Sequence, residues 1–501
     1  MKKNVLIIIT IAIFLLLSGV YAFYITPPTL SEGPDESGHF SYIHHLQVEN
    51  KLPVLNETFF YVGDEAYDAQ GGDLSEYKAR EIDDTMMDKG VNWIVQHPPF
   101  YYMVMALVLK VVRLFSDNLV IAIYAIRLAT MMLGALLLVF CNKFLDLLKA
   151  EKPFKIVFLG LLAFSPMLQF YFSVISNDSM LILVTTISLY YLIKYQKTNR
   201  LLDMALFTIF TSLIVLTKYT GCLIVIPYGL YFIYVFFKAK PKKRAWLNLL
   251  VCAMIAGVLI APHLVRNYHL YQKFLPTRNP IYQESFDYDF FSFIKIGYIA
   301  ELFKHLSYFV GWYHFVGAWK LVRLLYMLIF GAGVLMVSFW QNRQVRLRFN
   351  TLVLILLGGM AALMFAADFY YAEKSTALFS YGAIIILAAL LYRFYTETMH
   401  TVIKTDTEKG DMMMLFIASI LVVFIGLMYT HYNLFNRSGL LIATHGRYYY
   451  GLVFPFTYLV VRSYMPLLGS KKWAKVAIAC ILAVYIFADI YIMTYTASIW
   501  H

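Results

Sequence analysis

The sharpest concentration of reactive side chains lies just after the first apolar run, in residues 31–40 (SEGPDESGHF). Pro34 predicts a turn that holds Asp35 and Glu36 at a fixed place. A carboxylate held in this way can act as a general base toward a hydroxyl group, or can ligate a metal ion through oxygen. His39 follows near the same face of any helix that begins here. An acidic helix cap at a membrane edge is the alternative, and the residues alone leave both interpretations open.

A second group of polar and aromatic side chains lies at residues 96–102 (QHPPFYY). The two prolines after His97 predict an extended turn before a helix. His97 and Tyr101 lie at the end of the same outer segment that begins with Asp35. The alternative is a simple helix start with tyrosines at the membrane interface.

The composition places these motifs in a membrane protein. Of 501 residues, 60% are hydrophobic and only 14% are charged, whereas soluble domains carry roughly 25% charged residues. Apolar runs of about 20 residues, long enough to cross a bilayer, recur from end to end. The net charge of +12 lies in short clusters between these runs, so it does not imply a nucleic-acid partner. The four cysteines fall within or at the ends of apolar runs and suggest no disulfide framework.

The apolar runs predict an all-α polytopic fold with about 13 transmembrane helices and further helices at the outer membrane surface. The expected spans are 4–24, 119–141, 155–174, 179–195, 201–217, 221–237, 246–265, 319–340, 350–368, 376–395, 412–430, 449–467 and 474–496. The first run could also be read as a signal peptide, but its length favours an uncleaved anchor. In either case the chain beyond residue 25 begins outside.

The basic residues set the predicted orientation. With Lys2 and Lys3 inside, almost every inner loop carries a basic cluster, which places the N-terminus in the cytoplasm and the C-terminus outside. Residues 100–115 are the exception, because counting them as a span would reverse everything downstream. This run is short and contains Lys110 and Arg113, so we interpret it as an amphipathic helix on the outer surface. A full crossing is the alternative.

This topology divides the chain into five parts. The expected parts are a first anchor (1–24), an outer loop with surface helices (25–118), a transmembrane bundle (119–265), an outer interfacial segment (266–318) and a C-terminal bundle (319–501). Within the first loop, residues 56–90 are acidic and match no motif. Acceptor specificity is a candidate role for that stretch.

Cations on the outer side are informative because the positive-inside bias makes them scarce there. Lys218 lies in a very short outer loop, and Arg266 and Arg447 each lie at the outer mouth of a span. Arginine binds phosphate through two hydrogen bonds and lysine acts as a point charge. Contact with lipid headgroups is the alternative for each of them. The pair Asn177-Asp178, between two spans on the same side, adds a hydrogen-bonding and an acidic group.

The order of these motifs resembles the GT-C superfamily of membrane glycosyltransferases, which includes protein O-mannosyltransferases and the aminoarabinose transferase of lipid A. The chain is more similar still to the bacterial domain-of-unknown-function family 2142, a predicted GT-C branch. The similar positions keep their order over most of the chain. They are Pro34-Asp35-Glu36 with His39, Asn177-Asp178, Lys218-Tyr219, Arg266-Asn267-Tyr268 with Tyr271, Gly311-Trp312 and Gly446-Arg447-Tyr448.

The resemblance implies an enzyme of a bacterial plasma membrane that uses a polyprenyl-phosphate-linked sugar donor. The acceptor would be an extracytoplasmic glycan, lipid or protein. Asp35 would be the general base. Glu36 and His39 would position it, or Glu36 would help Asp35 hold a divalent cation such as Mg²⁺ or Mn²⁺. The implied substrate-binding residues are His97, Tyr101, Asn177, Asp178, Lys218, Arg266, Arg447 and Tyr448.

Three other functions compete with this interpretation, and one of them is a non-catalytic scaffold. A transporter or flippase for a lipid-linked saccharide would place ionisable residues near the middle of its spans. Here only Asp368, near a span end, and Asp489, within the last span, fit that pattern. A polysaccharide polymerase or ligase would share the cations but would not need the Asp35-Glu36 pair.

Overall fold

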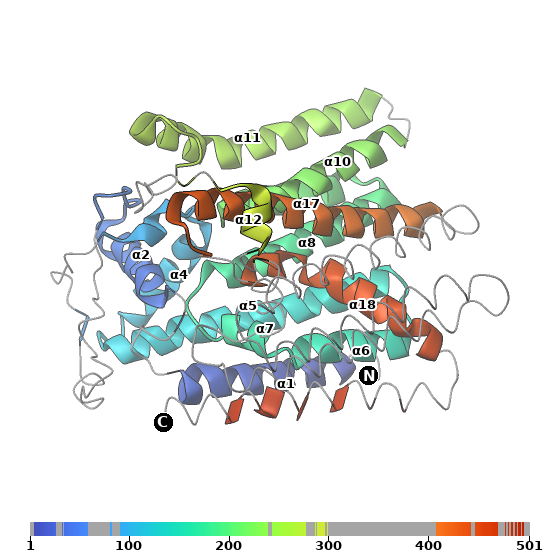
Figure 1. Ribbon diagram of the computed structural model, residues 1–501, viewed down its shortest axis with the longest axis horizontal. Coiled ribbons are helices and arrows are strands. Elements are labelled where there is room, and N and C mark those ends of the chain that lie inside the picture. The colour runs from blue at the N-terminus through green and yellow to red at the C-terminus, as the bar shows by residue number, and fades with distance from the viewer. Residues whose placement is uncertain are drawn as a thin grey trace.

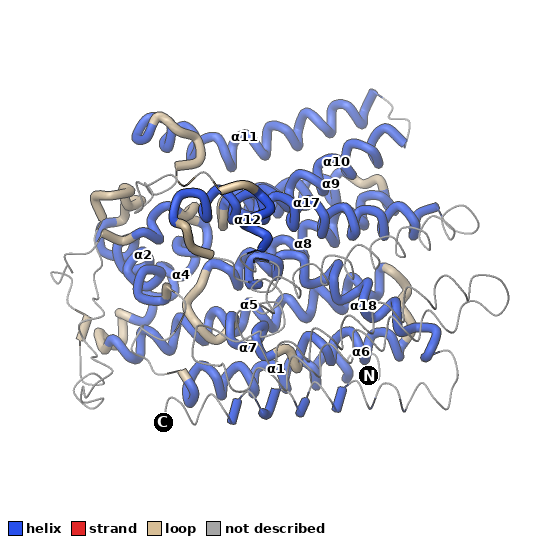
Figure 2. Tube along the Cα trace, viewed as in Figure 1, coloured by secondary structure: helices blue, strands red, loops and turns tan. Residues whose placement is uncertain are grey.

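In the computed structural model the described chain is a bundle of helices (Figure 1). The described residues are 5–26, 33, 35–58, 81–82, 91–238, 243–276, 286, 288–295, 298, 407–441, 446–468 and single residues or short runs between 476 and 494. Within these residues no strand forms, as Figure 2 shows, and a single bridge joins Glu81 to Asn118.

Five described helical segments are long and apolar enough to cross a membrane. They are α1 (Val5–Val20) continued by the π-helix η1 (Tyr21–Ile25), α5 (Leu119–Leu147), the 3-10 turn η4 (Tyr219–Gly221) continued by α10 (Cys222–Lys238), α11 (Lys243–Tyr271) and α17 (Thr407–Ser438). These segments run along the long axis of the molecule in Figure 1. Their lengths and apolar composition confirm the prediction of a helical membrane protein.

Shorter helices complete the bundle and one of its ends. They are α2 (Glu36–Glu49), η3 (Trp93–Gln96), α4 (Phe100–Val112), α6 (Lys152–Ala163), α7 (Pro166–Tyr171), α8 (Asn177–Thr198), α9 (Leu201–Val215), α12 (Phe290–Lys295), η5 (Gly446–Leu452) and α18 (Val453–Leu468). Helix α8 packs against α5 and α9, and α2 packs against α4. Helices α2 and α4 gather at the left end of the bundle in Figure 1, which we call the α2–α4 end.

The expected span 155–174 is wrong as a single helix. The structure divides it into α6 and α7, because Pro166 cannot continue a helix and Ser165 before it takes an extended conformation. The expected spans at 319–340, 350–368 and 376–395 lie outside the described residues, and 474–496 is described only in part. The count of about 13 spans therefore stays a prediction.

Helix α4 has the form expected of the run 100–115. Its 13 residues rise about 20 Å, which is less than the hydrocarbon core of roughly 30 Å. Met103, Leu107 and Val111, spaced four residues apart, are all exposed. Its other face packs on α2. The surface position of this helix stays a prediction.

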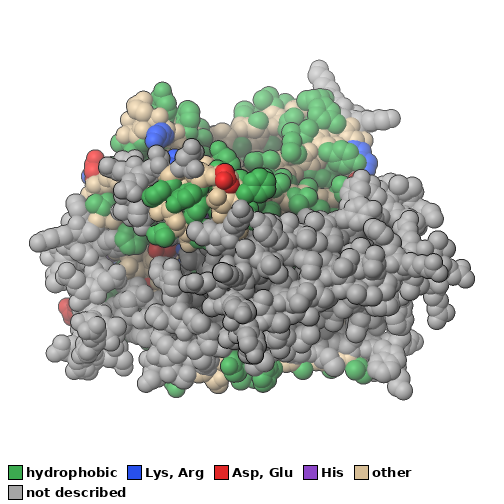
Figure 3. Space-filling view, viewed as in Figure 1, with side chains coloured by type: hydrophobic (Ala, Val, Ile, Leu, Met, Phe, Trp, Pro, Cys, Tyr) green, Lys and Arg blue, Asp and Glu red, His purple; other side chains and the backbone are tan. Residues whose placement is uncertain are grey.

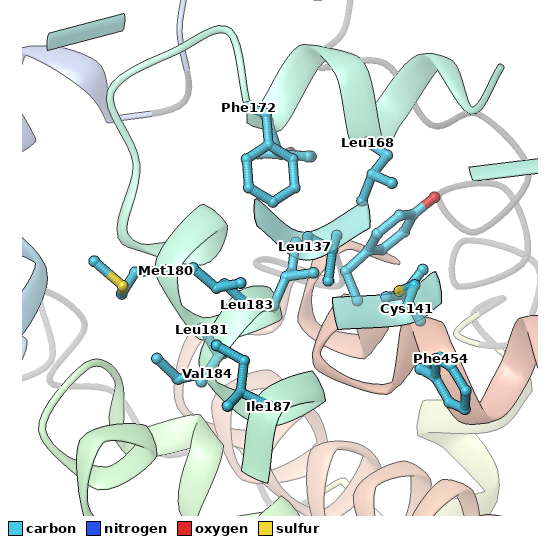
Figure 4. Close-up of a cluster of buried hydrophobic side chains, with 14 of the residues drawn as sticks. Leu137, Cys141, Leu168, Phe172, Met180, Leu181, Leu183, Val184, Ile187 and Phe454 are labelled. Carbon is cyan, nitrogen blue, oxygen red and sulfur yellow. The ribbon is translucent and has the colours of Figure 1, made fainter. Parts of the chain in front are cut away.

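The interior of the bundle is packed with aliphatic and aromatic side chains. Figure 4 shows Leu137 and Cys141 of α5 beside Leu168 of α7, Leu183 of α8 and Phe454 of α18. Helices α1 and α5 approach closely at a glycine, since a Cβ added to Gly134 would lie 2.4 Å from a ring carbon of Phe14.

The outside of the bundle is apolar as well. Figure 3 shows hydrophobic side chains spread over the described surface at the top of the view, where α10 and α11 lie. Leu247, Met254 and Val258 of α11 are more than half exposed. Such an extended apolar exterior suits contact with lipid chains and would be unfavourable in water.

Candidate active site

Asp35 lies at the start of α2, as the residue before its first turn. Its backbone has φ 57°, in the left-handed region, and its side chain makes no capping hydrogen bond. Aspartate tolerates this conformation better than most residues, and such strain gathers at functional sites. The indole Nε1 of Trp93 donates to Oδ1 at 3.3 Å, and Nη2 of Arg447 lies 3.3 Å from Oδ2. The carboxylate is 22% exposed, so a substrate hydroxyl can reach it.

Glu36, the neighbour of Asp35, is fully buried and paired with Arg127 of α5. Nε and Nη2 of Arg127 donate to Oε1 and Oε2 of Glu36 at 2.9 and 2.7 Å. Oε1 also accepts from the backbone N–H of Ile175 at 2.9 Å. Arg127 additionally donates to the carbonyls of Ala22 and Thr26. Glu36 therefore joins the end of α1, the start of α2, α5 and the loop before α8.

This pairing speaks against a metal ion at Asp35 and Glu36. Both Glu36 oxygens already accept charge-assisted hydrogen bonds, and Asp35 is in contact with a cation, Arg447. Among the residues that the structure describes, no three or more His, Cys, Asp or Glu side chains gather as metal ligands. Mg²⁺ and Mn²⁺ favour several carboxylate or water oxygens. Both oxygens of Glu36 are thus committed to Arg127, and of the two roles predicted for Glu36 positioning agrees with its contacts.

Beyond Asp35, an alternating chain of charges connects α8, η4 and η5. Asp178 accepts from Nζ of Lys218 at 2.6 Å, and its other oxygen lies 3.8 Å from Nε of Arg447. Asp178, Lys218 and Arg447 are each less than a tenth exposed. Charges buried this deeply require partners, and here each cation has a carboxylate within 4 Å. The positive charges of Lys218 and Arg447 and the negative charges of Asp35 and Asp178 cancel in formal charge.

Tyr448 provides an aromatic surface for both cations. Lys218 Nζ and Arg447 Cζ lie 5.2 and 5.4 Å from its ring centre. The preceding residue of α8, Asn177, donates from Nδ2 to the carbonyl of Thr217 at 3.3 Å. Asn177 thus connects the start of α8 to the loop that carries Lys218. These contacts bring together five of the predicted site residues: Asp35, Asp178, Lys218, Arg447 and Tyr448.

His39 and His97 lie side by side behind this cluster. His39 Nδ1 is hydrogen-bonded to the Tyr102 hydroxyl at 2.9 Å, and the His39 and His97 rings are stacked with centroids 6.4 Å apart. Burial, reinforced by the charge of Lys218, lowers the pKa of His39 to about 3. Burial also holds the pKa of His97 well below its ordinary value. Both imidazoles are therefore neutral near pH 7 and add no charge to the site.

Two predicted substrate-binding residues lie elsewhere. Tyr101 is completely buried, and its hydroxyl is 3.2 Å from Thr130 Oγ1 on α5, so the prediction that it binds substrate disagrees with its position in the core. Its neighbour Tyr102 is the tyrosine that contacts His39. Arg266, on α11, donates to the carbonyls of Leu52 and Pro53 at 3.0 and 2.9 Å instead of joining Lys218 and Arg447.

Arg127 and Trp93 were not predicted from the sequence to belong to the site. A charged residue in the middle of the predicted span 119–141 was a usable signal, because an arginine within a membrane helix needs a buried partner. Trp93 carried no such signal. It precedes the His97 motif by four residues, and only the path of the chain brings its indole to Asp35.

Comparison with known proteins adds a family and a distant structural likeness. The family described as "Predicted membrane protein (DUF2142)" matches residues 15–404. A comparison with curated proteins found no match. Crystal structures of ArnT from Cupriavidus metallidurans, bound to undecaprenyl phosphate and in the apo state, are 13% and 12% identical to this chain. Each comparison covers 93% of this chain and 78% of the ArnT chain, with a TM-score of 0.38.

Proposed function

The chain belongs to the DUF2142 family of predicted membrane proteins, and we propose that it is a glycosyltransferase that uses a polyprenyl-phosphate-linked sugar. The α2–α4 end would face the outside of the cell, with Lys2 and Lys3 in the cytoplasm. This orientation rests on the distribution of basic residues. The donor class rests on the order of motifs shared with GT-C enzymes.

The observation that supports this function most strongly is the contact between Asp35 and the buried cations. A partly exposed carboxylate in a left-handed turn lies 3.3 Å from Arg447, which lies 3.8 Å from the Asp178–Lys218 pair. Transfer with inversion needs a base on one side of the sugar and a stabilised leaving group on the other. Asp35 supplies a base, and Lys218 and Arg447 supply cations for a phosphate.

The proposed reaction is a single displacement at the anomeric carbon. Asp35 takes the proton of an acceptor hydroxyl as its oxygen bonds to that carbon, while the bond from the carbon to the phosphate oxygen breaks. The phosphate leaves on its polyprenyl chain, and Arg447 and Lys218 stabilise its negative charge. For this step Arg447 would shift from Asp35 toward the phosphate, which also frees the Asp35 oxygen for the proton.

Glu36, His39 and Tyr102 would act as positioning residues. The Glu36–Arg127 pair anchors the first turn of α2 directly after Asp35. The hydrogen bond between His39 and Tyr102 connects α2 to α4. Because the imidazole of His39 is neutral, it holds this geometry without competing for the donor phosphate.

The test replaces Asp35 by asparagine, which keeps the size of the side chain and removes the base. Membranes containing Asp35→Asn should transfer labelled sugar from a polyprenyl-phosphate donor at least about 100-fold more slowly than wild type. Asp117→Asn is the matched control, since Asp117 is an exposed aspartate just before α5 and pairs with Arg113. Transfer at the wild-type rate in Asp35→Asn would exclude the catalytic assignment. Movement of the donor across the bilayer without transfer would favour a flippase.

A further inference from the structure

The two oxygens of the Asp35 carboxylate have different partners. Oδ1 accepts from the indole Nε1–H of Trp93 at 3.3 Å, whereas Oδ2 lies 3.3 Å from Nη2 of Arg447. Given the proposed glycosyltransferase function, on which this inference rests, we propose that Trp93 is the positioning residue of the general base. Trp93 holds Oδ1 in place, and Oδ2 is the oxygen that takes the proton of the acceptor hydroxyl.

The two partners of Asp35 differ in what they do when the donor is bound. In the proposed reaction Arg447 shifts toward the donor phosphate and leaves Oδ2. The indole of Trp93 is neutral and donates a single hydrogen bond. It carries no charge that draws it toward the phosphate, so it stays on Oδ1 after Arg447 has left. Asp35 then has one oxygen fixed by a hydrogen bond and one oxygen free to accept a proton.

Trp93 is fixed relative to Asp35 through its neighbour Asn92, which is fully buried. Nδ2 of Asn92 donates to the carbonyl of Gly38 on α2 at 2.9 Å. Oδ1 of Asn92 accepts from the backbone N–H of Ile94 at 2.9 Å and so caps the first turn of η3. One amide side chain therefore joins the helix that begins after Asp35 to the turn that carries Trp93.

Close packing reinforces this junction between α2 and η3. A Cβ added to Gly38 would lie 2.6 Å from Cγ1 of Ile94, so the two elements approach at a distance that only glycine allows. The backbone N–H of Asn92 also donates to the carbonyl of Thr58 at 2.9 Å. Because η3 cannot move along α2 without breaking these contacts, the indole of Trp93 keeps its place at Asp35.

The hydrogen bond from Trp93 lies at an accessible part of the site. The Asp35 side chain is 22% exposed, and Trp93 is only partly buried. A hydrogen bond to a carboxylate is stronger than one between neutral groups. Catalysis by a base also depends on its orientation toward the reacting hydroxyl. Loss of the indole N–H should therefore slow the transfer step itself.

The first experiment replaces Trp93 by phenylalanine, which keeps an aromatic ring and removes the N–H. Initial rates of labelled sugar transfer in membranes, over a range of polyprenyl-phosphate donor concentrations, give kcat and the donor KM. Trp93→Phe should lower kcat about tenfold and leave the donor KM unchanged, because Trp93 acts on the base and not on the phosphate. Trp246→Phe, at an exposed tryptophan of α11, is the matched control and should change neither value.

A double variant separates positioning of Asp35 from a general structural role. If Trp93 acts through the Asp35 carboxylate, its replacement has nothing further to remove once that carboxylate is gone. Trp93→Phe combined with Asp35→Asn should therefore transfer sugar at the same rate as Asp35→Asn alone. A structural role would instead lower the rate by the same factor in both backgrounds.

A second measurement requires no sugar transfer. The chain has 7 tryptophans, so labelling with indole-¹⁵N tryptophan gives a small set of N–H signals by NMR from the purified full chain in detergent. The signal lost in Trp93→Phe identifies Trp93. It should move in Asp35→Asn, where a neutral amide replaces the charged acceptor. It should keep its position in Asp117→Asn, since Asp117 pairs with Arg113 instead.

Three results would overturn the inference. They are a wild-type kcat in Trp93→Phe, an equal loss from Trp93→Phe in the wild-type and Asp35→Asn backgrounds, and a Trp93 signal that does not move in Asp35→Asn. If wild-type membranes transfer no sugar while the Trp93 signal depends on Asp35, the glycosyltransferase function is wrong and the contact that positions Asp35 stands. The two proposals can therefore fail separately.

Discussion

Arg127 and Glu36 form a two-point ion pair in which neither side chain is exposed to solvent. Glu36 directly follows Asp35 in the chain, and its pair with Arg127 connects four segments of the bundle. A buried charge that loses its partner is far more costly than a pair replaced as a unit. The role of Glu36 can therefore be tested through stability, independently of catalysis.

Replacing either partner alone should destabilise the protein strongly. Arg127→Met leaves the Glu36 carboxylate buried without its cation, and Glu36→Leu leaves the guanidinium without its carboxylate. Each should cost about 3–5 kcal/mol of unfolding free energy. The double variant should recover part of that loss, which thermal unfolding in detergent measures as a double-mutant cycle. Additive losses in the double variant would show that the two side chains do not act as a pair.

Arg447 should govern the affinity for the donor more than the stability of the fold. Arg447→Ala should raise the donor KM about 10- to 100-fold, because a charge-assisted contact to phosphate is lost. Arg447→Lys keeps the charge without the two-pronged geometry and should fall between wild type and alanine. Initial rates over a range of donor concentrations give both KM and kcat. Arg113→Ala, at the end of α4, is the control, and a donor KM unchanged in Arg447→Ala would contradict the phosphate role.

Because His39 is neutral in the folded protein, we expect the protein to lose stability at acid pH. Its pKa is about 3 in the folded protein against 6.5 for a free side chain, because burial disfavours the charged form. Below pH 6.5 the unfolded chain therefore takes up a proton that the folded protein does not. Stability should fall as the pH drops from about 6.5 toward 3, by up to about 1.4 kcal/mol per pH unit.

His39→Gln should remove this contribution, so its unfolding temperature should decline less steeply between about pH 7 and pH 5 than that of wild type. His97 is buried in the same way and should retain its own share of the acid sensitivity. His269→Gln replaces an exposed histidine of α11 and controls for the loss of an imidazole. An equal slope in wild type and His39→Gln would show that His39 is not held neutral by the fold.

The sequence alone predicted a helical membrane protein and some of its local geometry. Hydropathy predicts membrane-length helices because the bilayer imposes a length on any apolar run. The segments α1 with η1, α5, η4 with α10, α11 and α17 have that length. The turn before α2 was also predictable, since it depends on neighbouring residues. The break between α6 and α7 also depends on neighbouring residues, and Pro166 was the residue from which it could have been predicted.

Only the tertiary structure decided which charges meet. Glu36 pairs with Arg127, 91 residues away, and Asp35 contacts Arg447, 412 residues away. Side-chain type and spacing could not separate the buried Glu36 from its partly exposed neighbour, or Tyr101 in the core from Tyr102 beside His39. Which face of α2 or α4 is buried depends on the helices packed around it, and those contacts join residues far apart in the chain. The chemistry of Asp35 was visible in the sequence, but its partners were set by packing.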